Sequence, residues 1–267
     1  MVTTIIGVVA VTIAVVLGVA LNRLTRRRTS DPDVGPTITD IASQALALAV
    51  LFLAFVLVDS SASYSRAAQA AVAEADVVDH MFELAAYSPE PQRQRIEGAV
   101  VCYARAILAY EWDQMDRGRS PVASVWSTRI RDTFAQIKEV DSGVFQMLVD
   151  ADRARSTARR DRIVEETSST PTTVTALMII TLALSLGAFA FGLPRRNNRG
   201  HVVVLAAVTL VLCGALLLIH DLEHPFSGPT HIAATAMRDT AADDAEDYLG
   251  TYPAASLRCD HNGKALE

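Results

Sequence analysis

The sequence predicts an all-α membrane protein with four transmembrane helices and a helical extramembrane domain between the second and third helices. Four apolar stretches of 18 to 22 residues contain no Asp, Glu, Lys, Arg or His: Val2–Leu21, Ile41–Val58, Thr172–Leu193 and Val202–Ile219. Each stretch is long enough to cross a hydrocarbon core of about 30 Å as an α-helix. The chain's 24 basic and 30 acidic residues all lie elsewhere. The long polar segment has apolar residues at helical spacing and no sustained alternation typical of a strand.

These patterns divide the chain into four segments. Residues 1–59 hold the first two transmembrane helices and a short Arg-rich loop, and residues 60–171 form the helical extramembrane domain. Residues 172–220 hold the last two transmembrane helices, and residues 221–267 form an acidic C-terminal tail. The first apolar stretch is interpreted as a transmembrane helix, because four arginines follow it, whereas a signal peptide has its positive charge before the apolar run.

The two short loops between apolar stretches predict the orientation of the chain. The first loop, Asn22–Asp40, contains four arginines, and the second loop, Pro194–His201, contains three arginines and no acidic residue. Positively charged short loops remain on the cytoplasmic side of a membrane. We therefore expect both loops in the cytoplasm, and the N-terminus, the helical domain and the C-terminus outside.

Prolines mark the expected helix boundaries within the polar segment. The segment Ser88–Pro91 ends one helix and begins the next, and Ser120–Pro121 supplies an N-cap and a first-turn proline. The first of these helices is expected to continue the second transmembrane helix, from about Thr39 to Tyr87, without interruption by Pro or Gly. Arg153–Glu166 is rich in charge and is interpreted as a solvated helix face with no chemical role.

The predicted long helix carries a seven-residue repeat of mainly small side chains. Such a repeat is typical of supercoiled helix pairs, and alanine allows the two backbones to approach closely. The partner helix can belong to the same subunit or to a second copy in a homo-oligomer. The repeat comprises Tyr64, Ala68, Ala71, Ala75, Val78, Phe82 and Ala85, and the same spacing extends back through Leu57, Ala54, Val50 and Ala47.

Composition and motifs argue against several classes of function. A net charge of −6 disfavours a nucleic-acid-binding protein. Cys102, Cys213 and Cys259 form no CxxC pair, so neither a disulfide framework nor a zinc site is expected. Nucleotide-binding and hydrolase motifs are absent, so no cofactor is predicted. The apolar stretches contain no ionisable side chain besides Cys213, and the protein is therefore not expected to be an enzyme.

The C-terminal tail combines a polar cluster with a strongly acidic segment. The cluster follows the fourth apolar stretch, and His220, Asp221 and His224 within it are the candidate metal ligands, because imidazoles four residues apart share a helix face. The favoured interpretation is a group of interfacial polar residues that end a helix, so no metal site is predicted. Asp243–Asp247 is expected to lie on a weak acidic helix, and the final residues are expected to be poorly ordered.

Within the polar cluster, the stretch DLEHPFSG resembles the signature of a bacterial family of bestrophin-like membrane proteins of unknown function. The resemblance covers about residues 1–232, with signature positions at Asp221, Pro225, Phe226 and Gly228. It extends to a YAR…EW stretch that contains Tyr103, Ala104, Arg105, Glu111 and Trp112. The resemblance implies four spans and a large helical domain per subunit, as in the bestrophins, which are oligomeric anion channels of cell membranes. Bestrophins have that domain in the cytoplasm, opposite to the orientation that the arginines predict.

Two functions are therefore expected for a protein of this class. The first is a homo-oligomeric ion channel in the bacterial cell membrane. Its candidate pore-lining residues are Phe52 and Phe55, which lie near each other on the second transmembrane helix, and Asp59 at its mouth. Phenylalanines can form a hydrophobic constriction, although they can equally face lipid or a neighbouring helix. The alternative is a non-conducting scaffold or sensor that binds a protein partner through the helical domain and the acidic tail.

Overall fold

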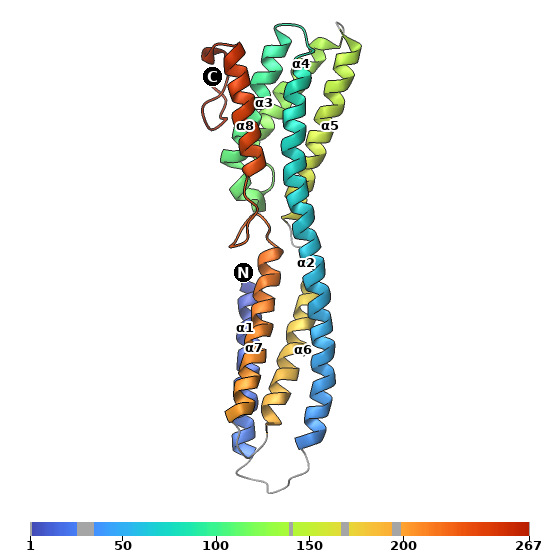
Figure 1. Ribbon diagram of the computed structural model, residues 1–267, viewed down its shortest axis with the longest axis vertical. Helices are drawn as coiled ribbons and strands as arrows, with labels where there is room; N and C mark the ends of the chain where they lie inside the picture. Colours follow the sequence, from blue (N-terminus) through green and yellow to red (C-terminus); the bar gives the residue numbers. More distant parts are fainter. Residues whose placement is uncertain (1, 26–34, 139–140, 167–170, 194–198, 267) are drawn as a thin grey trace. The chain divides into compact units, whose positions relative to one another are not determined.

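The computed structural model describes residues 2–25, 35–138, 141–166, 171–193 and 199–266, and these residues are almost entirely helical (Figure 1). In chain order, the helices are α1 (Val2–Thr25), α2 (Gly35–Ala85), α3 (Gln92–Tyr110), α4 (Pro121–Ile137), α5 (Ser142–Glu165), α6 (Thr172–Phe191), α7 (Arg199–Leu222) and α8 (Thr235–Thr251). The described part of the chain contains no β-strand, only an isolated bridge between Cys259 and Ala265. The all-α fold class is thereby confirmed.

The helices form two compact units. A membrane unit comprises residues Met1–Ser63 and Ser168–Glu223, and an extramembrane unit comprises Tyr64–Thr167 and His224–Glu267. The sequence predicts a separate acidic tail at residues 221–267. From His224 onward, this tail instead belongs to the same unit as the polar segment between the second and third spans.

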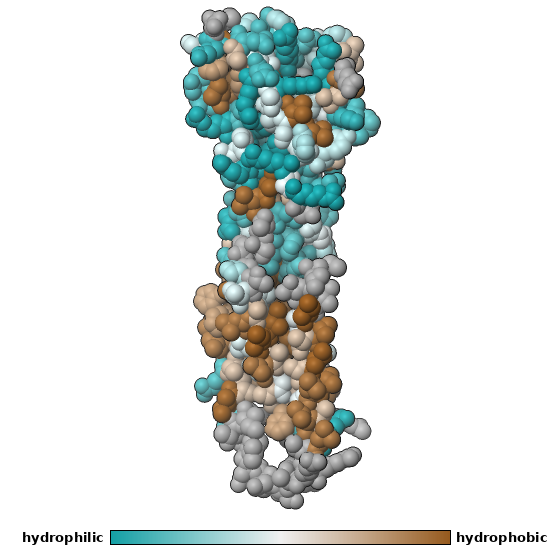
Figure 2. Space-filling model, turned by 180° about the vertical axis from the view of Figure 1, so that it is seen from behind, coloured by the Kyte–Doolittle hydropathy of each residue, from teal (hydrophilic) through white to brown (hydrophobic). Residues whose placement is uncertain are grey.

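The membrane unit consists of α1, the N-terminal part of α2, α6 and α7, which run side by side in Figure 1. Each of the four helices is long and apolar enough to cross a bilayer, which confirms the four predicted spans. Large apolar side chains such as Leu17, Leu184 and Val211 are exposed on this unit, and Figure 2 shows apolar residues gathered over its surface. Most of the two Arg-rich loops, residues 26–34 and 194–198, lies outside the described residues.

Helices α1 and α6 approach each other closely at two glycines. A Cβ atom placed on Gly18 would lie 2.3 Å from the carbonyl oxygen of Gly187 and 2.8 Å from the Cβ of Ala190. Small residues allow this kind of backbone contact between membrane helices. One turn further along α1, the side-chain amide of Asn22 donates a 3.2 Å hydrogen bond to the Leu193 carbonyl at the end of α6.

Gly18→Val is therefore expected to destabilise the membrane unit by about 1–3 kcal/mol, because the larger side chain must push α1 away from α6. The measurement is the thermal unfolding of the detergent-solubilised protein, followed by circular dichroism. Gly214→Val is the matched control, because a Cβ on Gly214 of α7 would meet no atom within 4 Å. Equal melting temperatures for the two variants would show that the glycine contact is unimportant.

Helix α2 spans 51 residues without a break, close to the predicted range. In the extramembrane unit most of its predicted repeat is buried, with Ala71, Ala75 and Val78 all 0–3% exposed, whereas Tyr64 and Ala68 are half-buried. In the membrane unit, however, the repeat is not the buried face: Ala47, Val50 and Ala54 are exposed, while Ala49, Leu53 and Val56 are buried. A seven-residue repeat drifts by about 20° per heptad around a straight helix, so one repeat cannot follow one face over such a length.

The extramembrane unit is built around α3. From Ile96 to Ile107 almost every residue of α3 is buried, against the C-terminal half of α2 and against α4 and α8. The predicted boundaries hold at both proline segments, since α2 ends at Ala85, α3 begins at Gln92 and α4 begins at Pro121. Ser120 occupies the N-cap position of α4 without a side-chain capping bond.

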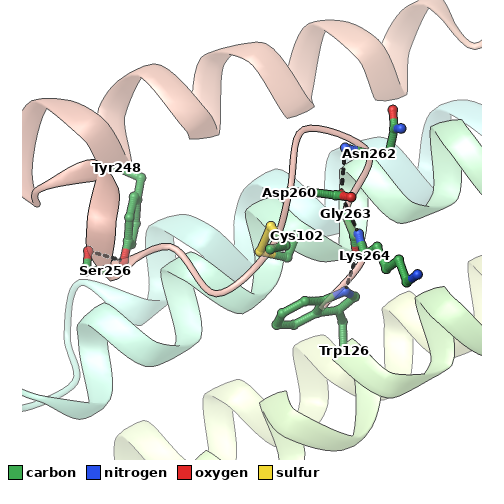
Figure 3. The surroundings of a disulfide bond; sticks show 9 residues. Cys102, Trp126, Tyr248, Ser256, Asp260, Asn262, Gly263 and Lys264 are labelled. Carbon is green, nitrogen blue, oxygen red and sulfur yellow. Dashed lines mark hydrogen bonds between the residues drawn. A yellow bond between two sulfur atoms is a disulfide. The ribbon is translucent and has the colours of Figure 1, made fainter. Parts of the chain in front are cut away.

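The C-terminal segment is docked onto this core, contrary to the expectation of poorly ordered final residues. Helix α8 confirms the predicted acidic helix and buries Met237, Ala241 and Tyr248. Beyond it, the indole nitrogen of Trp126 donates a 2.6 Å hydrogen bond to the Gly263 carbonyl (Figure 3). Gly263 has φ of +79°, and a Cβ on it would lie 2.3 Å from the Ala106 nitrogen, so the turn requires glycine.

A disulfide bond fastens the same segment to α3. It joins Cys102 and Cys259, whose Cα atoms are 5.8 Å apart and whose positions are separated by 157 residues (Figure 3). The expectation that the cysteines would not form disulfides is therefore wrong for this pair. Two isolated cysteines at such a separation carry no spacing signal, and only the packing of the C-terminal segment on α3 brings them together.

Candidate functional site: a buried arginine–carboxylate network

Three arginines of α5 point into the extramembrane unit. Arg155, Arg159 and Arg162 follow the four- and three-residue spacing of one helix face and are 1%, 4% and 0% exposed. The interpretation of this segment as a solvated face is therefore wrong for these residues. A buried guanidinium is costly unless it is paired and hydrogen-bonded, so its partners decide what the cluster can do.

Two buried glutamates neutralise two of the arginines. The Nε of Arg162 lies 2.5 Å from an oxygen of Glu74 in α2, and its Nη2 lies 2.7 Å from an oxygen of Glu111, directly after α3. Arg159 forms a two-pronged pair with the same Glu111. Glu74 and Glu111 are 0% and 1% exposed, so all four charges are withdrawn from water.

Neutral donors complete the coordination of the two carboxylates. The hydroxyl of Tyr103 donates a 2.6 Å hydrogen bond to Glu74, and the backbone N–H of Ser120 donates a 2.7 Å hydrogen bond to Glu111. The network thus links α2, α3, the segment before α4, and α5. A bidentate arginine–carboxylate geometry of this kind is among the strongest and most directional contacts in proteins.

Aromatic rings and a second ion pair extend the network. The guanidinium of Arg155 lies 4.5 Å from the centre of the Tyr103 ring, and that of Arg162 lies 4.9 Å from the centre of the Trp112 ring. Arg155 also pairs with Asp152 at 2.5 Å, and Asp152 accepts a further hydrogen bond from Arg131. These cation–π contacts add attraction where the cations are desolvated.

The network holds its charges fixed near neutral pH. Burial would raise the pKa of Glu111, but the hydrogen bond and charge of Arg159, together with the charge of Arg162, lower it below its ordinary value. Burial and the adjacent Glu74 carboxylate raise the pKa of Tyr103. Burial opposes the charge of Arg162, yet its carboxylate partners raise its pKa. These groups therefore position helices rather than transfer protons at neutral pH.

The two sequence motifs that carry the family resemblance meet beside this network. The rings of Trp112 and Phe226 pack edge to face, with centroids 5.6 Å apart. The backbone N–H of Phe226 donates a 3.1 Å hydrogen bond to Glu166, at the end of α5. Pro225 is buried, and Gly228 has φ of +107°, a conformation that favours glycine. The Phe226 turn is thus seated on both the EW stretch and the end of α5.

The remaining motif residues have different surroundings. Tyr103 and Glu111 belong to the network, Ala104 is buried in the core, and Arg105 is half-buried. Asp221 is half-buried at the end of the membrane unit.

Other residues singled out from the sequence do not join the network. Among the residues that the structure describes, no three His, Cys, Asp or Glu side chains are grouped to hold a metal ion, so His220, Asp221 and His224 do not form such a cluster. Phe52, Phe55 and Asp59 lie on the exposed surface of the membrane unit.

The network itself was missed, although one signal for it exists in the sequence. Glu74 interrupts an alanine-rich run at a position next to Ala75 of the seven-residue repeat. A carboxylate beside such a seam requires a cationic partner, and α5 offers arginines at matching helical spacing.

The fold and these contacts define a four-span helical membrane protein. Its extramembrane unit is also helical, and buried ion pairs join the helices within that unit. The model of the Bestrophin-like domain matches residues 6–237, and the chain belongs to this family. No curated protein matches the chain in sequence.

Crystal structures of a bacterial bestrophin homologue from Klebsiella pneumoniae share the fold. One, carrying a point mutation, is 12% identical with a TM-score of 0.70, over 93% of this chain and 99% of the other. Another, phased with zinc, is 14% identical with a TM-score of 0.68, over 94% and 98% of the two chains. A membrane protein of 12% identity also superposes with a TM-score of 0.70, over 94% and 100%.

Proposed function

We propose that this protein is a homo-oligomeric ion channel of the bacterial cell membrane in which α2 lines the ion pathway. The observation that carries the proposal is the bestrophin-like fold, which extends over nearly the whole chain. The resemblance to bestrophins implies an oligomeric channel. An ion pathway between subunits requires a transmembrane helix with one face that does not pack against other helices of its own subunit.

Helix α2 has such a face. Leu53 and Val56 are buried within the membrane unit, whereas Phe52 is 38% and Phe55 is 64% exposed. Asp59, one turn beyond Phe55, is exposed as well. A ring of phenylalanines contributed by several subunits would form a hydrophobic constriction, which closes a pore by excluding water. The exposed Ala47, Val50 and Ala54 offer small side chains for contact between neighbouring copies.

Phe55→Ala is expected to increase ion flux several-fold, because a smaller side chain widens and wets the constriction. The measurement is the flux of chloride and of potassium in liposomes that contain the purified protein. Leu17→Ala is the matched control, since Leu17 is an exposed apolar residue of α1. Absence of flux of either ion in the wild type and in Phe55→Ala, or an equal change in Leu17→Ala, would contradict the proposal.

We further propose that the extramembrane unit and both termini lie outside the cytoplasm. The two Arg-rich short loops support this orientation by the positive-inside rule, and an even number of spans leaves both ends on one side. The Cys102–Cys259 disulfide supports it independently, because disulfides persist in oxidising compartments and are rare in the cytoplasm. The orientation is opposite to the cytoplasmic domain that the bestrophin resemblance implies.

Labelling of intact cells with a membrane-impermeant maleimide tests this orientation. In a Cys213→Ala background, Asp161→Cys on the exposed face of α5 is expected to react from outside. Asn197→Cys, in the second short loop, is expected to react only after the cells are permeabilised. The reverse pattern, or a Cys102–Cys259 pair that is reduced in freshly isolated cells, would refute the proposed orientation.

The second candidate function is a non-conducting sensor or scaffold. The feature that favours it is the docking of α8 and the C-terminal segment onto α3, which gives the extramembrane unit a defined surface. A stable hetero-complex recovered in mild detergent, together with an absence of ion flux, would favour this function over a channel. Neither proposal assigns a catalytic role to the protein.

A further inference from the structure

A cavity of about 450 Å³ lies in the extramembrane unit between α3, α4 and the C-terminal segment. The first turn of α3 contributes Arg95, α4 contributes Trp126 and Arg129, and the C-terminal part contributes Tyr248 and Arg258. Its volume falls within the range of about 300–1,000 Å³ that is usual for small-molecule sites. The cavity is separate from the arginine–carboxylate network and from the membrane unit.

The lining of this cavity has an excess of positive charge. It contains three arginines, Arg95, Arg129 and Arg258, and one carboxylate, Asp132. Across the described residues, none of these three guanidinium groups takes part in an ion pair with Asp or Glu. This contrasts with Arg159 and Arg162 of α5, whose charges are neutralised by buried glutamates. All three arginines are exposed at the cavity, and guanidinium groups without a carboxylate partner favour an anionic ligand.

The positions of two arginines are constrained by neighbouring side chains. The Nη1 of Arg95 donates a 3.0 Å hydrogen bond to the side-chain oxygen of Gln136. The guanidinium of Arg129 lies 4.6 Å from the centre of the Trp126 ring. The first turn of α3 also borders the cavity without a side-chain cap, so the positive end of the helix dipole adds to the field of the arginines.

Two aromatic side chains, Trp126 and Tyr248, border the cavity, and Figure 3 shows both beside the C-terminal segment. Trp126 and Tyr248 are each 1% exposed. The Trp126 indole is held by its bond to Gly263, and the Tyr248 hydroxyl is 2.9 Å from the Ser256 hydroxyl. The disulfide at Cys259, next to Arg258, anchors the C-terminal side of the cavity to α3. The wall is therefore preorganised, which reduces the entropy cost of binding.

We propose that this cavity binds a small anion that carries a carboxylate or phosphate group. The planar guanidinium groups match the paired oxygens of such a group, and the volume of the cavity accommodates an attached organic body. The same chemistry is present in soluble organic anions and in anionic lipid headgroups. The site does not depend on ion conduction, because all of its residues belong to the extramembrane unit.

Binding is measured by isothermal titration calorimetry on the full-length protein in a neutral detergent. The probes are citrate and inorganic phosphate, with chloride at the same ionic strength as the reference. Lipid binding is measured with nanodiscs that contain phosphatidylglycerol or only phosphatidylcholine. We expect citrate to bind to the wild type. The double variant Arg129→Gln/Arg258→Gln is expected to weaken citrate binding at least about tenfold, which corresponds to about 1.4 kcal/mol of binding free energy.

Arg153→Gln/Arg160→Gln is the matched control, because it removes the same charge from exposed positions of α5 outside the cavity. It is expected to bind citrate as the wild type does. Arg258→Lys keeps the positive charge but loses the planar guanidinium group that can bind two oxygens at once. It is expected to weaken citrate binding to an intermediate degree and to leave the fold intact. Binding of phosphatidylglycerol alone, lost in the cavity variant, would identify the anion as a headgroup. Failure of every probe to bind, or equal losses in cavity and control variants, would overturn the proposal.

Discussion

Arg162→Met is expected to lower the free energy of unfolding of the extramembrane unit by about 3–5 kcal/mol, because it leaves the buried Glu74 carboxylate without an arginine partner. Arg162 is 0% exposed and contacts both Glu74 and Glu111. Only Glu111 keeps an arginine partner in the variant. The measurement is denaturant unfolding followed by tryptophan fluorescence, which reports on this unit because both tryptophans of the chain, Trp112 and Trp126, belong to it.

Two further variants separate the network from a general effect of losing an arginine. Arg160→Met, an exposed position on the same helix, is expected to change the free energy of unfolding by no more than about 0.5 kcal/mol. Adding Glu74→Gln to Arg162→Met removes the stranded charge and is expected to recover part of the loss. If Arg160→Met is as harmful as Arg162→Met, or if Glu74→Gln recovers nothing, the ion pairs do not hold the unit together.

The stability of the extramembrane unit is expected to fall as pH rises from about 4 to about 8. Asp244 of α8 is 2% exposed and shares a hydrogen bond with Asp79 of α2. Burial, followed by the charge and hydrogen bond of Asp79 and the charges of Asp247 and Asp243, raises the pKa of Asp244 to about 8. Burial, with further contributions from neighbouring acids, also raises the pKa of Asp79.

The sign follows from proton binding. Below about pH 4, Asp244 is protonated in both the native and the unfolded chain, and its contribution to stability is fully present. Between about pH 4 and 8 the unfolded chain has lost this proton while the native protein retains it, so each pH unit lowers the free energy of unfolding by up to about 1.4 kcal/mol. Above about pH 8 both states are ionised and the curve levels.

Asp244→Asn is expected to remove most of this slope, because an amide is neutral at every pH and can still donate to Asp79. The measurement is the free energy of denaturant unfolding at pH 5, 6, 7 and 8. Asp239→Asn, an exposed position on the same helix, is expected to leave the slope unchanged. A slope that survives in Asp244→Asn would show that the Asp79–Asp244 pair is not its source.

Several features of the protein follow from local sequence. The four spans follow from length and the absence of charge, which are properties of single segments. Helix α2 is continuous because no Pro or Gly interrupts it between Thr39 and Ala85, and the boundaries near Pro91 and Pro121 follow from the missing N–H of proline. The bestrophin-like family was recognisable for the same reason, since the motif around Phe226 and the YAR…EW stretch are short and contiguous.

Only the tertiary structure decided which side chains meet. Glu74 and Arg162 are 88 positions apart, and Cys102 and Cys259 are 157 apart, so no local pattern couples either pair. The sequence of the charged segment of α5 is equally compatible with a solvated and with a buried helix face. Helical spacing places its arginines on one side of the helix but does not determine what covers that side. Composition determines the solvent of each segment, whereas the partner of each buried charge depends on packing between distant helices.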